Sequence, residues 1–385
     1  MALFDRAEHE PLTASEWVES EARAGVERIV ADAVEACEPG RFWTRNPLDS
    51  YGLSVDRDRS LWIGAAGVLW ALDRLEVGLG EGGLYDSWRG QPDVPGSSGL
   101  MMGETGVLLV SWRLEPTPEK ADRIFELVAG NVRNPEHELF NGAPGTMLAA
   151  LHLYEATGEE RWRSLWRECA GAVLDEFRPD SELGCSIWIQ YRRGRLIRSI
   201  GAGHGFASNV RSLLRGQHLL GKEAADELQS AAAETAAVLA LCEDGRVNWP
   251  TAADEYWAEQ FPTRVQWCHG APGLITALAT LPREDETDEL LTAAGDLVWH
   301  AGPLRKGPGL CHGTSGNGCA FLALHARTGE ERWLERARAF AMHALHQTES
   351  AQPRYSLWTG SIGVALYLRA CLDGGWDGMP VIDVL

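Results

Sequence analysis

Lysine is nearly absent from this chain. Its 385 residues include 55 aspartates and glutamates but only three lysines, Lys120, Lys222 and Lys306, and the formal net charge is -20. A field of that sign repels polyanions, so we expect neither a nucleic-acid partner nor an anionic membrane surface. The scarcity also makes each lysine worth examining for a specific role.

Long apolar runs are missing as well. No stretch of about 18 apolar residues is present, so no transmembrane helix is predicted. The first ten residues have neither the basic start nor the apolar core of a signal peptide, which predicts a cytoplasmic protein. The eight cysteines are scattered and form no C-x-x-C pair, so a disulfide framework is not expected.

A short glycine motif, in contrast, recurs along the chain. A G-x-x-G element followed by an apolar run occurs in six copies, and a seventh copy has the variant G-x-x-S. The first glycines of successive copies are 39, 39, 63, 65, 43 and 47 residues apart, which is the spacing of an array of helical hairpins. The copies begin at Gly64, Gly103, Gly142, Gly205, Gly270, Gly313 and Gly360.

The sequence around these glycines predicts two kinds of helix. Behind each copy, as in residues 68–75 and 364–370, the chain is apolar over most of a helical circumference, which indicates buried helices. Charged amphipathic stretches lie between the copies and indicate outer helices with one wet face. These stretches are residues 119–133, 159–177, 222–241, 284–300 and 330–346. The alternation predicts an all-α fold, a seven-fold α/α toroid with inner and outer rings of helices and all inner helix starts at one end, in a single domain covering residues 1–385.

Two features depart from the repeat. Residues 76–99 are rich in Gly, Pro and Ser, so the outer helix there is expected to be short or replaced by a loop. The two longest intervals contain strand-like pieces, residues 185–190 and 195–200 around a turn at 192–194, which predict a β-hairpin, and residues 245–249. Both insertions precede copies with candidate site residues, so we expect them to form part of the wall of the pocket at the site.

Two Cys-His-Gly triplets stand at the same register of the repeat. Cys268 and His269 end one loop, and Cys311 and His312 end the next. Neighbouring inner helices would bring the two loops together. Zinc prefers cysteine and neutral histidine, and three protein ligands leave a fourth position for water or substrate. We therefore predict a catalytic zinc site that uses both cysteines and one of the two histidines, and the local spacing does not decide between His269 and His312.

At these motifs the chain resembles the lanthionine synthetase C-like family, and the similarity extends over nearly the whole sequence. The segments that carry it are residues 203–205, 267–273, 306–317 and 356–363. The resemblance implies a seven-fold α/α toroid with one zinc ion held by Cys268, Cys311 and His312. It also implies the addition of a thiol to dehydroalanine or dehydrobutyrine in a peptide or protein, forming a thioether. Zinc suits this reaction because coordination shifts a thiol of pKa about 8.5 toward its thiolate.

Four further residues match active-site positions of the family. Attack at the β-carbon leaves an enolate, which needs charge stabilisation on oxygen and a proton on the α-carbon. His204, directly before the repeat glycine, resembles the family's catalytic histidine, and Arg264 resembles its active-site arginine. Lys306 matches a lysine of the glutathione-using branch. Glu138 aligns with an acidic residue that orients the site, and it stands where the dedicated cyclases have Asp.

The thiol substrate stays open between two alternatives. It is either glutathione or a cysteine of the same peptide, which would give a lanthionine ring, and Lys306 together with the two triplets favours the glutathione branch. A protein of another class also fits: a scaffold that retains zinc and binds glutathione or a peptide without turnover. A carbohydrate-active α/α toroid would need paired acids at the helix starts, where this chain has Cys and His.

Overall fold

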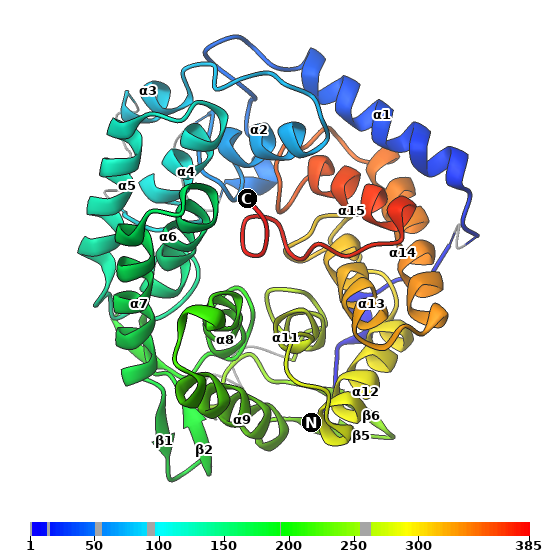
Figure 1. The fold of residues 1–385 in the computed structure, drawn as a ribbon. Coiled ribbons are helices and arrows are strands. Elements are labelled where there is room, and N and C mark those ends of the chain that lie inside the picture. Colours follow the sequence, from blue (N-terminus) through cyan, green and yellow to red (C-terminus); the bar gives the residue numbers. More distant parts are fainter. Residues whose placement is uncertain (1, 14–15, 51–55, 91–96, 193, 255–262) are drawn as a thin grey trace.

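The computed structural model describes residues 2–13, 16–50, 56–90, 97–192, 194–254 and 263–385. Its helices form two concentric rings, so the predicted α/α toroid is confirmed (Figure 1). Within these residues the inner ring has seven helices, and each begins directly after the first glycine of a repeat copy. They are α2 (Ala65–Arg74), α4 (Glu104–Leu114), α6 (Ala143–Thr157), α8 (Phe206–Arg215), α11 (Ala271–Leu278), α13 (Thr314–Thr328) and α15 (Ser361–Asp373). Consecutive inner helices contact each other, and α15 contacts α2, which closes the ring.

The outer helices lie around this ring (Figure 1). They are α1 (Glu19–Glu35), α3 (Leu84–Arg89), α5 (Pro118–Asn131), α7 (Glu160–Asp175), α9 (Lys222–Val238), α12 (Asp285–Ala301) and α14 (Glu331–Glu349). Five of them match the predicted amphipathic stretches, and α3 is the short helix expected between residues 76 and 99. Helix α1 was not predicted. It packs on α15 from the other end of the chain and so covers the last inner helix.

Backbone crowding explains the second glycine of the repeat. A Cβ atom added at Gly316 would lie 1.8 Å from the carbonyl oxygen of Leu310, and one at Gly106 would lie 1.8 Å from that of Leu100. In the copies that have this glycine, the chain turns into the inner helix with the preceding loop packed directly on the helix backbone. These loops also replace side-chain caps: the amide of Thr314, the first residue of α13, donates to the carbonyl of Gly307 at 3.0 Å.

The described part of the chain also contains three short 3₁₀ helices and three two-stranded ribbons. The 3₁₀ helices are η1 (Arg6–Glu8), η2 (Pro47–Asp49) and η3 (Gln217–Leu219). The ribbons pair β1 (Arg178–Asp180) with β2 (Cys185–Ile187), β3 (Gln190–Arg192) with β4 (Arg195–Ile197), and β5 (Leu241–Glu243) with β6 (Arg246–Asn248). The hairpin predicted around residues 192–194 is confirmed as β3–β4. The prediction of one continuous strand over residues 185–190 is wrong, because β2 pairs backward with β1 and a new ribbon begins at Gln190.

The last residues of the chain, 374–385, run through the middle of the ring (Figure 1). His152 in the second half of α6 lies 2.8 Å from the Val381 carbonyl, through its Nε2, and Arg211 in α8 donates from Nε to Asp383 at 2.6 Å. This segment therefore packs against the later parts of the inner helices. The helix starts lie at the other end, where the triplets are. None of the described helices has the length and apolar character needed to cross a membrane.

Candidate metal and acid–base site

A ring of backbone hydrogen bonds links the loops at the helix starts. In each bond, the residue two positions before a repeat glycine donates its N–H to the carbonyl at the same position of a neighbouring copy. The described residues form six such bonds: Met101 to Phe140 (3.2 Å), Trp62 to Met101 (2.9 Å), Trp358 to Trp62 (3.2 Å), Cys311 to Trp358 (2.7 Å), Cys268 to Cys311 (3.0 Å) and Gly203 to Cys268 (3.2 Å). We call this set the backbone ring. It fixes the relative positions of the loops before any side chain is considered.

The backbone ring brings the two triplets together. Cys268 and Cys311 are directly bonded neighbours in it, and both side chains are buried. Their sulfur atoms and a ring nitrogen of His312 all lie within 4.8 Å of one another. His269 is not in this group, and no other cluster of three potential metal ligands occurs among the described residues. Two sulfurs and one imidazole nitrogen at this separation are a donor set that fits zinc.

A hydrogen bond joins the two thiols and shifts their pKa values in opposite directions. A hydrogen bond from Cys311 holds the pKa of Cys268 well below its usual value, against the effect of burial, and His269 and His312 act in the same direction. The same bond, together with burial, raises the pKa of Cys311 well above its usual value. These opposite shifts favour a state in which Cys268 is the thiolate and Cys311 the thiol.

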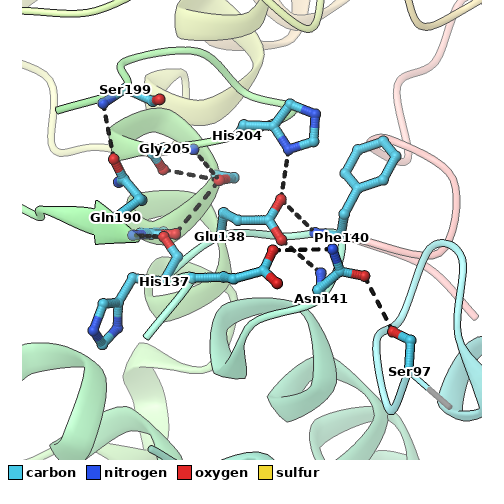
Figure 2. A network of polar contacts seen from close by, with 12 residues as sticks. Ser97, His137, Glu138, Phe140, Asn141, Gln190, Ser199, His204 and Gly205 are labelled. Carbon is cyan, nitrogen blue, oxygen red and sulfur yellow. Dashed lines mark hydrogen bonds and ion pairs between the residues drawn. The ribbon is translucent and has the colours of Figure 1, made fainter. Parts of the chain in front are cut away.

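Glu138 and His204 meet where the backbone ring is open. The described residues show no ring bond from Phe140 to Gly203, because the Phe140 amide donates instead to Glu138 Oε2 at 3.0 Å. That same oxygen lies 2.5 Å from His204 Nδ1. The backbone N–H of Asn141 donates to the other oxygen, Glu138 Oε1, at 2.6 Å (Figure 2). Glu138 is fully buried, whereas the His204 side chain is 21% exposed. A side-chain pair thus takes the place of the seventh backbone bond.

The His204 imidazole faces the cysteine loops. Its ring centroid lies 6.3 Å from that of His269 and 4.4 Å from that of Phe140. Gly203, the preceding residue, donates its amide to the Cys268 carbonyl. The structure therefore brings the predicted acid–base histidine and the predicted metal ligands to one end of the toroid.

Lys306 and Arg264 lie on the loops that carry the cysteines. The Lys306 ammonium forms a 2.7 Å ion pair with Glu8 and lies 3.3 Å from Gln266 Oε1. Arg264 is half-buried in the loop before α11, where its carbonyl accepts a hydrogen bond from Asn248 at 3.1 Å. Among the described residues its guanidinium has no hydrogen-bond or ion-pair partner. Residues 255–262, which precede it, lie outside the described part.

A cavity of about 1080 Å³ borders Lys306. It lies between the loops of the sixth and seventh copies, the segment from Glu10 to Thr13, and helices α1 and α14. Its lining includes Arg28, Arg305, Lys306 and Arg354. The same lining includes the acids Glu10, Asp32 and Glu349, so the cavity presents charged groups of both signs.

Gln266 is a site residue that the sequence analysis missed. Its buried amide donates from Nε2 to the Cys268 sulfur at 2.9 Å. A signal exists in the repeat: four positions before the glycine, five copies have Gly or Ser, and only Glu138 and Gln266 have long polar side chains there. Comparison of the copies at that register would have found both residues.

Comparisons with known proteins identify relatives of this chain. A family model described as "Lanthionine synthetase C-like protein" matches residues 189–381, half of the chain. The curated protein "Glutathione S-transferase LANCL1" of Danio rerio is 34% identical over 127 residues, which are 31% of this chain and 31% of that protein. "LanC-like protein GCL1" of Arabidopsis thaliana is 36% identical over 111 residues, 26% of this chain and 25% of that protein. These matches thus span a third or less of the relatives' own length.

One solved structure shares the fold over almost the full length. It is that of "Nisin cyclase", with a TM-score of 0.61 at 15% identity, covering 91% of this chain and 94% of that one. At that identity the likeness shows the architecture alone.

Proposed function

Since the chain belongs to the lanthionine synthetase C-like family, we propose that it is a zinc-dependent enzyme that forms thioethers. It adds a thiol, from glutathione or a peptide cysteine, to dehydroalanine or dehydrobutyrine in a peptide or protein. The observation that carries the proposal is the convergence of Cys268, Cys311 and His312 within 4.8 Å, at the same end of the toroid as the Glu138–His204 pair. We further propose that residues 1–385 act as a single domain.

Cys268, Cys311 and His312 would hold the zinc ion. When bound, zinc would favour the ionised form of the incoming thiol. The new bond joins the sulfur to the β-carbon of the dehydroamino acid, and the electrons of its double bond move to the carbonyl oxygen as an enolate. The proton lost by the thiol balances the proton gained at the α-carbon, so no other reactant is consumed.

His204 and Arg264 would serve the second half of this reaction. The Glu138 carboxylate accepts a hydrogen bond from His204 Nδ1, which fixes the tautomer and leaves Nε2 to exchange a proton with the substrate. Arg264 would stabilise the negative charge on the enolate oxygen, because a guanidinium group donates hydrogen bonds and carries a positive charge. His204 would thus transfer the proton, and Arg264 would stabilise the negative charge.

Glutathione is the thiol that the surroundings favour. It is a tripeptide with two carboxylates and one ammonium group, and the neighbouring cavity of about 1080 Å³ is lined by Lys306 and three arginines together with Glu10, Asp32 and Glu349. Cavities that bind small molecules have about this volume, with a few charged groups to fix the ligand's orientation. Lys306 would contribute one such group next to the Cys268 loop.

Incubation of the zinc-loaded protein with a dehydroalanine peptide and glutathione tests the proposal. We expect a peptide product heavier by one glutathione, by mass spectrometry, and no such product with Cys311→Ala. A peptide that also contains cysteine tests the intramolecular alternative, because ring closure leaves the mass unchanged and removes a free thiol. Binding without either product, at full zinc occupancy and with several peptides, would instead support a non-catalytic scaffold.

A further inference from the structure

Gln266 lies at the centre of a chain of polar contacts that ends at a proposed zinc ligand. The chain runs from the Glu8 carboxylate to the Lys306 ammonium (2.7 Å), from there to Gln266 Oε1 (3.3 Å), and from Gln266 Nε2 to the Cys268 sulfur (2.9 Å). Gln266 is 3% exposed, so its amide makes these contacts away from bulk water.

These contacts determine which partner faces the Oε1 atom of the Gln266 amide and which faces its Nε2 atom. A lysine ammonium has only donors, so it requires the amide oxygen on its side. The NH₂ group must then face Cys268, and the bond to the sulfur is a donated hydrogen bond. Lys306 thus holds the amide in the orientation in which it can stabilise a thiolate.

The repeat shows why a long side chain at this position is unusual. Where other copies have glycine at this position, a Cβ atom would collide with the next loop: at Gly99 it would lie 2.3 Å from the Phe140 carbonyl, and at Gly201 2.1 Å from the Cys268 carbonyl. Only the third and fifth copies place long polar side chains here. In the third, Glu138 fixes His204. The fifth has Gln266.

From this parallel we infer that Gln266 is a positioning residue for the metal centre, held by Lys306, which orients the Cys268 sulfur and stabilises its negative charge by an N–H···S hydrogen bond. The inference rests on the proposed function only in assuming that a metal ion binds at Cys268, Cys311 and His312. Partners of metal ligands typically change metal affinity by about 10–100-fold when they are removed.

Cobalt(II) added to the metal-free protein provides a readout independent of turnover. Gln266→Met keeps the size of the side chain and removes the donor. We expect cobalt affinity, measured against a competing chelator, to fall about 10–100-fold, and the sulfur-to-cobalt charge-transfer band to move to longer wavelength because the sulfur electrons are less stabilised. Lys306→Met leaves Gln266 in place but releases its orientation, so a smaller shift in the same direction is expected.

Gln347→Met is the matched control, because that glutamine bonds Glu10 and the Leu304 carbonyl and contacts none of the proposed ligands. It should leave the band and the affinity unchanged. A folded Gln266→Met protein with the wild-type band and affinity would overturn the inference and leave the proposed function intact. If Gln266→Met does not fold, an unshifted band in Lys306→Met overturns it instead. If the wild-type protein binds cobalt without sulfur ligation, both the inference about Gln266 and the proposed function are wrong.

Discussion

His204 Nδ1 lies 2.5 Å from Glu138 Oε2 at the place where the backbone ring is open. The carboxylate is fully buried and also accepts the amides of Phe140 and Asn141, so it cannot turn away from the imidazole. One buried group therefore both interrupts the ring and fixes the histidine. This arrangement gives the proposed general acid a defined tautomer and a defined position.

Removing the histidine should slow the chemical step without releasing zinc. For His204→Asn we expect kcat for thioether formation to fall about 10²–10⁴-fold, the range typical of a lost general acid–base group. Glu138→Gln should reduce kcat less, because the imidazole remains but loses its fixed tautomer. Rates would be measured by mass spectrometry alongside metal content. Loss of zinc in His204→Asn would contradict this assignment and point to a structural role at the metal.

Zinc content separates the proposed ligands from their neighbours. Cys268→Ala, Cys311→Ala and His312→Ala should each lose stoichiometric zinc, because the remaining two donors leave the ion half-coordinated. The measurement is elemental analysis of the purified proteins. Cys319→Ala, also a buried cysteine but inside α13, is the matched control and should retain zinc. Zinc loss in His269→Ala with retention in His312→Ala would reassign the third ligand.

Lys306 should govern the affinity for glutathione. Replacing it by Met removes a charged hydrogen-bond donor worth about 1.5–3 kcal/mol, so KM for glutathione should rise about 10–100-fold. Cyclisation of a cysteine-containing peptide should change less. Lys120→Met is the control, because its ammonium pairs with Glu115 on another part of the ring. An equal loss with both thiols would mean that Lys306 acts through Gln266 and not on glutathione.

The N-terminal segment should loosen in acid. His9 is 6% exposed and lies 2.9 Å from the Gly302 carbonyl through Nδ1. Burial lowers its pKa below 6.5, although the hydrogen bond to Gly302 and the charge of Glu8 oppose the shift, and Lys306 adds to it. The folded state, in which residues 2–13 are packed on the protein, therefore disfavours the protonated form of His9. Its stabilisation is therefore complete above pH 6.5 and is lost as the pH falls from 6.5 through the lowered pKa.

Hydrogen exchange measured at several pH values tests this expectation. In the wild type, the protection of residues 2–13 should be constant above pH 6.5 and should fall as the pH is lowered below 6.5. In His9→Gln, which cannot titrate, the change should be much smaller. A similar loss of protection in both proteins would assign the pH dependence to another group.

The second glycine of the repeat should be essential for stability. In Gly316→Ala the new Cβ would lie 1.8 Å from the Leu310 carbonyl oxygen. Backbone must move to relieve this overlap, so we expect a loss of about 3 kcal/mol in the free energy of unfolding. Gly171→Ala is the control: it lies in the outer helix α7 with nothing within 4 Å of the new atom, and should stabilise by about 0.5–1 kcal/mol. Urea unfolding measures both.

Much of the fold could be predicted because its cause is local. The glycines at the inner helix starts, such as Gly313 and Gly360, recur because a side chain there would strike the preceding loop. Apolar runs behind them mark helices buried on all sides. Helix α1 was missed because nothing near residues 19–35 indicates that it packs on α15, more than 300 residues later. The β1–β2 pairing was missed for a related reason, since a three-residue strand has too little pattern of its own.

By itself, the sequence determined the seven helix starts and the residues that could carry zinc and acid–base chemistry. These are properties of short segments, because steric crowding and donor type act within a few residues. Only the tertiary structure decided which of these residues meet. Closure of the ring grouped His312 rather than His269 with the two sulfurs, and it joined Glu138 to His204 across 66 residues. It also turned Gln266 toward Cys268. The distances between separate loops depend on how the ring of helices closes, so they cannot be predicted from short segments of the sequence.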